Sequence, residues 1–179
     1  MMVVSLLLIL NFSIGVSAST NCDRQEADTC ITTSQRLSIK GGSPSGKVWD
    51  YSKQFNGELS NFNDGYNIYS VVDKDMYLVQ FYSGAEVGSG RSLKYWTTIE
   101  EANGISTIDE YMDNMALLSD WGSRDNVSIA RIPAGTKIKY AVGTARRKVG
   151  RFETRPGGGL QILFERFNDS WVIDTRKLP

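Results

Sequence analysis

The sequence predicts an α+β domain, built on a mainly antiparallel, strongly bent sheet of about six strands with two helices inserted in the middle of the chain. Two observations support this class. Runs of β-branched and aromatic residues occur on both sides of a central section, as is typical of strands. In the central section itself the apolar residues recur at three- and four-residue spacing, as in a helix with one buried face.

The first eighteen residues resemble a secretory signal peptide. An uncharged apolar run covers residues 3–10, and the small residues Val16, Ser17 and Ala18 suit cleavage after Ala18. The run is too short to span a bilayer, although a membrane anchor is the alternative interpretation. We therefore expect a secreted, extracellular protein with no stable membrane insertion after signal cleavage. In an oxidising compartment Cys22 and Cys30 would pair as a disulfide.

Residues 19–65 show no sustained helix or strand period. They are rich in Ser, Gly, Asn and Asp with scattered aromatic residues, so we expect an N-terminal arm that packs onto a catalytic-type domain spanning residues 66–179. That domain begins with two strand-like runs, residues 67–72 and 76–82. A polar turn at residues 73–75 separates them, which indicates a hairpin.

Two helices follow these strands. Residues 98–102 form a short helix that Asn103 and Gly104 end, and Thr107 with Glu110 forms a capping box for a longer helix that runs to about Ser119. We expect the apolar stripe of the longer helix to face the core, with its methionines as core residues: Ile108, Tyr111, Met112, Met115 and Leu118.

Four more strands complete the sheet. Residues 127–132 and 137–142 flank a turn at residues 133–136, and the alternation of the second run indicates one buried face. Residues 160–165 and 170–174 are the last two strands, and a polar turn at residues 167–169 joins them.

Composition excludes several kinds of chemistry. The 179-residue chain contains no histidine, which removes Ser-His-Asp and Cys-His catalysis and zinc sites built on histidine, and we expect no metal site. Its 20 Lys and Arg balance its 20 Asp and Glu, so electrostatics give no reason to expect a nucleic-acid or anionic-membrane partner. The remaining candidates for chemistry are carboxylates, arginines, amides and hydroxyls.

The most unusual local feature is a triple glycine, Gly157, Gly158 and Gly159, that leads directly into a strand. Three glycines lose backbone entropy on folding, so some position requires a positive φ or a very close approach of the backbone, and a ligand is the first candidate. On the strand Gln161 points away from its apolar neighbours and offers an amide that both donates and accepts. The alternative is a flexible surface loop with a solvated Gln161.

Two arginines are candidate anion ligands. Arg91 follows a strand, lies among glycines and precedes Tyr95 and Trp96, a setting that suits a phosphate clamp beside a stacked planar ring. Arg131 shares a strand face with apolar residues, so it either pairs with a carboxylate at the sheet edge or binds an anion. The basic residues of the segment 146–155 are interpreted as a solvated loop.

The segment from Val127 to Leu178 resembles the C-terminal half of the NAD glycohydrolase domain named after the tuberculosis necrotizing toxin, which also occurs in secreted fungal NADases. The resemblance rests on a strand ending in Val142-Gly143-x-Ala145 and on the element Pro156-Gly-Gly-Gly-Leu-Gln161, which precedes a final apolar strand. It implies a catalytic role for Gln161 and for an upstream arginine, which we assign to Arg91, with Arg131 in the second arginine role.

The resemblance implies a secreted, toxin-like NAD(P) glycohydrolase that cleaves the nicotinamide–ribose bond. NAD or NADP would be the substrate and no cofactor is needed. The glycines would admit the dinucleotide and Tyr95 or Trp96 would stack on nicotinamide, and a protein partner would be an immunity protein or a target. One alternative is a mono-ADP-ribosyltransferase toxin, for which the late strand offers only Glu165. Another is a secreted binding module without catalysis.

Overall fold

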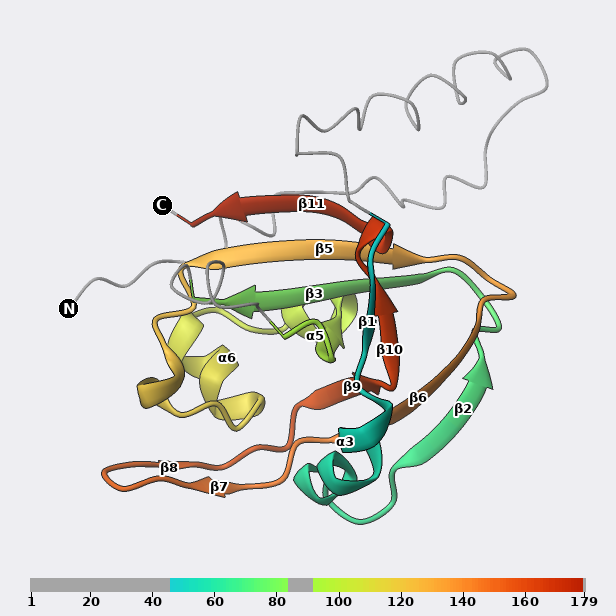
Figure 1. Ribbon diagram of the computed structural model, residues 1–179. Helices are drawn as coiled ribbons and strands as arrows, with labels where there is room; N and C mark the ends of the chain where they lie inside the picture. Colours follow the sequence, from blue (N-terminus) through green and yellow to red (C-terminus); the bar gives the residue numbers. More distant parts are fainter. Residues whose placement is uncertain (1–45, 84–91, 179) are drawn as a thin grey trace, which may run out of the picture.

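The structure, a computed structural model, describes residues 46–83 and 92–178 and has an α+β fold (Figure 1). Its main sheet has 7 strands in the order β11-β5-β3-β4-β9-β6-β2, and every neighbouring pair is antiparallel. The predicted fold class is therefore confirmed. The strands of this sheet are β2 (Asn67–Val71), β3 (Met76–Tyr82), β4 (Tyr95–Thr98), β5 (Asn126–Ile132), β6 (Lys137–Thr144), β9 (Leu160–Phe164) and β11 (Val172–Lys177).

The sheet bends strongly where β4 connects its two halves. Figure 1 shows β11, β5 and β3 running side by side, whereas β9, β6 and β2 slope away from them. Strand β4 pairs with β3 through Thr97 and Thr98 and with β9 through Tyr95 and Trp96. Strand β4 has only four residues, and a helix follows it at once. So short a segment shows too few alternating positions for its strand period to be recognised in the sequence.

The prediction that residues 67–72 and 76–82 form a hairpin is wrong. Strand β2 pairs with β6 at one edge of the sheet, whereas β3 lies in the interior between β4 and β5. Burial explains the separation, because β2 is exposed along its whole length while the last five residues of β3 are buried. The connecting Asp75 binds Arg131 and the backbone N–H of Ala134 instead of closing a tight turn.

The two central helices are α5 (Ile99–Asn103) and α6 (Ile108–Asn114). Thr107 caps α6 by accepting a hydrogen bond from the Glu110 N–H at 3.1 Å, as the capping box predicts. The helix ends five residues earlier than expected, and the chain turns at Ala116, whose φ is +53°. Of the predicted stripe Tyr111, Met112, Met115 and Leu118 are buried and Ile108 is partly buried.

Residues 46–65, the end of the expected arm, share the core of the sheet. They form β1 (Val48–Asp50), α3 (Ser52–Glu58) and a 3-10 turn (Leu59–Asn61). Strand β1 pairs with β10 (Arg166–Asn168), and Phe55 and Phe62 are buried against Ala141 and Leu163 of the sheet. No boundary in the packing falls at Tyr66.

The helices pack against two separate clusters of the sheet. Helices α5 and α6 cover a cluster that includes Val79, Phe81 and Tyr111, and α3 lies farther along, beside β9 and β6 (Figure 1). A two-stranded hairpin, β7 (Lys148–Val149) with β8 (Thr154–Arg155), extends away from the sheet between α6 and α3. Residues of α6, α3 and this hairpin line a cavity.

Candidate functional site

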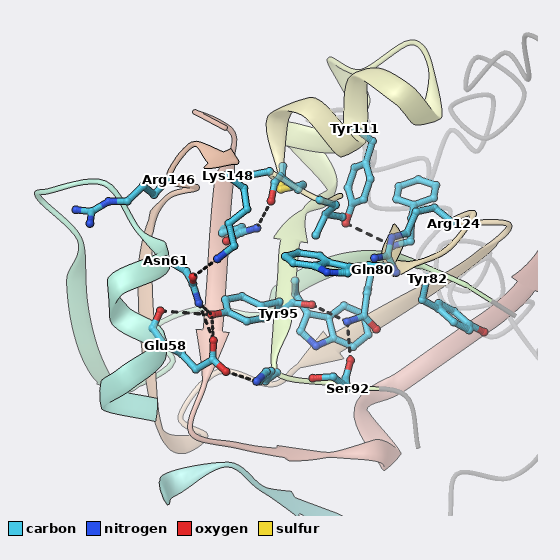
Figure 2. A pocket seen from close by; sticks show the side chains of 18 residues that line it. Glu58, Asn61, Gln80, Tyr82, Ser92, Tyr95, Tyr111, Arg124, Arg146 and Lys148 are labelled. Atoms are coloured by element: carbon cyan, nitrogen blue, oxygen red, sulfur yellow. Dashed lines mark hydrogen bonds and ion pairs between the residues drawn. The ribbon is translucent and has the colours of Figure 1, made fainter. Parts of the chain in front are cut away.

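A cavity of about 440 Å³ opens between the helices and the bend of the sheet. Its volume falls in the range of small-molecule sites, about 300–1,000 Å³. Figure 2 shows Glu58, Asn61 and Lys148 toward one end, Arg124 and Tyr82 toward the other, and Tyr95 and Gln80 between them. The lining residues are Glu58, Asn61, Gln80, Phe81, Tyr82, Ser92, Lys94, Tyr95, Trp96, Tyr111, Met115, Ala116, Leu117, Trp121, Arg124, Arg146, Lys148 and Gln161.

A polar network centred on Glu58 forms one wall. Glu58 accepts hydrogen bonds from the Tyr95 hydroxyl at 2.8 Å and from the Asn61 amide nitrogen at 2.7 Å, and its other oxygen forms an ion pair with Lys94. The Asn61 amide oxygen accepts a hydrogen bond from Lys148 at 2.8 Å. These contacts tie α3 and the 3-10 turn to β4 and to the β7–β8 hairpin.

The protonation states within this network follow from its contacts. Burial acts to raise the pKa of Glu58, but hydrogen bonds from Lys94 and Tyr95 outweigh it, so the pKa is lowered from 4.5. Burial raises the pKa of Tyr95 far above its ordinary value, and the neighbouring Glu58 carboxylate raises it further. At neutral pH Glu58 is therefore a carboxylate and Tyr95 a neutral phenol, which donates a proton in its hydrogen bond and does not act as a base.

The strand ends that frame the cavity are held by Gln80. Its side chain is buried, and its amide nitrogen donates to the carbonyl oxygens of Ser92 at 2.8 Å and Tyr95 at 2.7 Å. These bonds hold the backbone at Ser92 and Tyr95, where β4 begins, against β3 at the bend of the sheet. Because Tyr95 leads into β4, the position of its ring in the cavity depends on this side chain.

Gln161 reaches the cavity from β9, next to the end of α6. Its side chain is only 7% exposed, and its amide nitrogen donates to the Met115 carbonyl oxygen at 2.8 Å. This bond leaves the amide oxygen as the atom that can accept a hydrogen bond from a ligand.

The triple glycine runs beside the same helix end. The N–H groups of Gly157 and Gly159 donate to the carbonyl oxygens of Asp113 and Asn114, each at 2.9 Å, so they bind the last two carbonyls of α6. A Cβ on Gly159 would lie 2.7 Å from the Met115 methyl carbon and 2.8 Å from the Asn114 carbonyl oxygen.

Close backbone approach is thus the reason for the glycines, as the sequence indicates, but the approaching group belongs to the chain itself. A Cβ on Gly157 would lie 2.3 Å from the Ala145 carbonyl oxygen, and Gly157 and Gly158 have φ values of +72° and +99°. None of the three glycines lines the cavity. Their role in the structure is to place the Gln161 strand against α6.

The structure brings three of the predicted site residues together and separates a fourth. Gln161, Tyr95 and Trp96 line the cavity, although one face of the Trp96 ring is stacked on Phe167 at 4.9 Å between ring centroids. Arg131 does not line it. Its guanidinium instead binds Asp75 at 2.6 Å at the end of β5, so it pairs with a carboxylate, which was one of the two expectations, although β5 is an interior strand and not a sheet edge.

Three further predicted residues lie outside the part of the chain that the structure describes. They are Arg91, Cys22 and Cys30, and with them the signal peptide and the disulfide. Ser92, which follows Arg91, does line the cavity.

Sequence reasoning missed several cavity residues. Glu58 and Asn61 come from the segment taken as an arm, and Arg146 and Lys148 come from the segment taken as a solvated loop. Arg155 of the same segment is buried and binds Asp109 and Asp113 of α6 at 2.7 and 2.8 Å. The sequence offered one indication of these residues: Glu58 and Asn61 are three positions apart, so a helical turn would place a carboxylate and an amide on the same side.

Two properties of the described residues bear on ligands and membranes. Within residues 46–83 and 92–178 no group of three or more Asp, Glu, Cys or His is arranged to hold a metal ion. Over the same ranges no helix has the length and hydropathy to cross a membrane.

Comparison with known proteins adds little to this geometry. No protein-family model matches the chain, and no curated protein matches it significantly. A solved structure described as Tne2 in complex with Tni2 is similar over 66% of this chain and 98% of that chain, with 15% sequence identity and a TM-score of 0.44. Both values are low, so this likeness carries no argument about the site.

Proposed function

We propose that the protein is a secreted NAD(P) glycohydrolase that converts NAD or NADP and water into nicotinamide and the corresponding ADP-ribose product. One observation carries the proposal. The cavity combines the amide of Gln161 and the ring of Tyr95 with four cationic side chains, Lys94, Arg124, Arg146 and Lys148, and only one carboxylate among the described residues that line it. Aromatic walls with an excess of cations suit a phosphorylated ligand with planar rings.

The reaction fits the groups available. In NAD the nicotinamide ring is a cation, and when the bond between its nitrogen and the ribose carbon breaks, the electron pair returns to the ring, which leaves as a neutral molecule. The oxygen of water bonds to the same ribose carbon and releases a proton. Because the leaving group needs no protonation, the site requires orientation and electrostatic stabilisation more than a general acid, which suits a chain without histidine.

Gln161 is the residue that we place at the reacting centre. Its amide nitrogen is held by Met115, so its oxygen is directed for a hydrogen bond with a ribose hydroxyl or with the attacking water. Lys148 and Arg146 would bind diphosphate, and Tyr95 would contact nicotinamide. Arg91 keeps the phosphate-binding role that its sequence setting predicts, beside the catalytic role that the resemblance implies. A protein partner, whether an immunity protein or a target, belongs to the toxin-like part of this proposal.

Hydrolysis is favoured over ADP-ribosyl transfer by the position of Glu165. This late-strand glutamate is the candidate that a transferase would use. It lies outside the cavity, with its carboxylate 3.6 Å from the Lys139 ammonium group.

The test is release of nicotinamide from NAD by the purified mature protein. We expect Gln161→Ala to lower kcat about 100-fold or more, because a positioned polar group at a reacting centre contributes on that scale. Asn67→Ala, which removes an exposed amide on β2 outside the cavity, should keep the wild-type rate. Circular dichroism should show both variants folded. A wild-type protein that releases no nicotinamide would refute the function, and a fully active Gln161→Ala would refute the role of Gln161.

A further inference from the structure

Trp121 presents an unusual surface at the cavity. It ends a 3-10 turn (Ser119–Trp121) after α6, lines the cavity and is 43% exposed. Of the other lining aromatic residues, Phe81, Tyr82, Trp96 and Tyr111 are buried and Tyr95 is partly buried. Water contact with so much of an indole is unfavourable, and an exposed aromatic face at the edge of a cavity offers a platform for another planar ring.

A lysine lies over the same ring. The Lys148 ammonium group is 5.8 Å from the centroid of the Trp121 ring, and its hydrogen bond to Asn61 uses one of its three donors. Among the described residues no carboxylate lies within ion-pair distance of Lys148. Two N–H donors of a cation are therefore available next to an open aromatic face.

Arg146 adds a second cation at this place. It lines the cavity and its guanidinium lies 3.2 Å from the Asp64 carboxylate, but the Asp64 side chain is fully exposed. An ion pair at such an exposed site contributes little, so an anionic ligand can replace Asp64 without a large loss.

We propose that Trp121, Lys148 and Arg146 form the subsite for the adenylate half of the dinucleotide, an inference that rests on the proposed function. Adenine stacks on the indole, and the two cations bind the diphosphate. A phosphate alone needs only the cations, whereas a flat aromatic face beside them fits a base attached to a phosphate. The nicotinamide ribose then extends toward Gln161, and the site selects adenine dinucleotides over nicotinamide mononucleotide.

Isothermal titration calorimetry with ADP-ribose and with nicotinamide mononucleotide tests the subsite, because only the first ligand carries adenine. We expect Trp121→Ala to raise the Kd for ADP-ribose about 5- to 100-fold, the range for loss of one base stack. The Kd for nicotinamide mononucleotide should stay within about twofold of the wild-type value. Trp121→Phe, which keeps an aromatic face, should recover most of the affinity for ADP-ribose.

Lys148→Gln should weaken the binding of both ligands, because both carry phosphate. Two matched controls lie outside the cavity: Phe152→Ala removes an 80% exposed aromatic residue, and Lys137→Gln removes an exposed lysine. Neither should change the Kd of either ligand. An unchanged Kd for ADP-ribose in Trp121→Ala, or an equal loss for both ligands in that variant, would overturn the subsite.

Parallel measurement of nicotinamide release separates this inference from the proposed function. If the wild-type protein hydrolyses NAD while Trp121→Ala binds ADP-ribose normally, the subsite is refuted and the function stands. If ADP-ribose binds in a Trp121-dependent way but NAD is not cleaved, the function is refuted and the subsite stands.

Discussion

Glu58 carries the one carboxylate among the described residues that line the cavity, and its surroundings keep it ionised. Lys94, Tyr95 and Asn61 all donate to it, so both of its oxygens are engaged within the protein. This engagement makes Glu58 a residue that positions the Tyr95 hydroxyl and the 3-10 turn, and the cavity keeps its excess of positive charge.

The lowered pKa of Glu58 predicts a pH-dependent contribution to stability. The folded-state pKa lies below the unfolded value of 4.5, so the contribution is fully present above pH 4.5 and is lost as the pH falls through the folded-state pKa. At neutral pH we expect Glu58→Gln to lower the free energy of unfolding by about 1 kcal/mol. The difference from wild type should shrink as the pH is lowered from about 6 to about 3.

Urea unfolding at several pH values measures this difference. Phe152→Ala removes no titrating group, so its difference from wild type should stay constant over the same range. A Glu58→Gln difference that is equally constant would contradict the assignment.

At the scale of elements, the end of α6 and the glycine segment stabilise each other. The backbone of residues 157–159 supplies hydrogen bonds to the last carbonyls of the helix, and Arg155 binds two aspartates on its surface. This arrangement fixes the direction in which Gln161 points, because the strand that continues from the glycines must present Gln161 to Met115. The catalytic candidate is therefore positioned by a helix terminus and not by a flexible loop.

Gly159→Ala should disturb this junction. Its Cβ would meet the Asn114 carbonyl oxygen at 2.8 Å, and we expect a loss of about 1–3 kcal/mol in stability together with reduced activity through displacement of Gln161. Gly57→Ala is the matched control, because nothing lies within 4 Å of its Cβ and it occupies α3, where alanine is favoured by about 0.5–1 kcal/mol. Thermal unfolding of both variants checks the opposite signs, and a Gly159→Ala protein as stable as wild type would contradict the close approach.

At the scale of the whole molecule, the cavity exists because segments distant in sequence pack together. Residues 46–65 bring Glu58 and Asn61 to the sheet, and the hairpin brings Lys148 from the other half of the chain. Gly143 allows Tyr66 and Phe62 to pack closely against β6, since a Cβ at this position would lie 2.7 Å from the Tyr66 Cβ and 3.0 Å from a Phe62 ring carbon. Loss of the packing between Phe62 and β6 would therefore open the site as well as the core.

Phe62→Ala should reveal this coupling. Phe62 is buried against Ala141 and Leu163, and truncation of such a side chain costs about 3–5 kcal/mol. Because Phe62 follows the turn that carries Asn61, we also expect weaker binding of ADP-ribose. Phe152→Ala, at the exposed hairpin, should change stability by less than about 0.5 kcal/mol. Equal effects of the two substitutions on unfolding in urea would contradict the placement of Phe62 in the core.

Local patterns in the sequence predict those features whose causes are local. The N-cap at Thr107, the apolar stripe of residues 108–118 and the strand character of residues 76–82 depend on neighbouring residues, and the structure confirms each. The sequence also predicts that the triple glycine allows a close backbone approach. It does not predict which group approaches, because the end of α6 lies more than forty residues earlier in the chain.

The sequence by itself determined the α+β class, the central helices and the candidate Gln161. Only the tertiary structure decided that β2 and β3 are not partners, that Arg131 pairs with Asp75 away from the cavity, and that Glu58 and Lys148 line it. The physical reason is that periodicity and capping act over a few residues. Strand order and cavity walls depend instead on contacts between segments such as residues 46–65 and β9, whose separation in the chain leaves no local pattern.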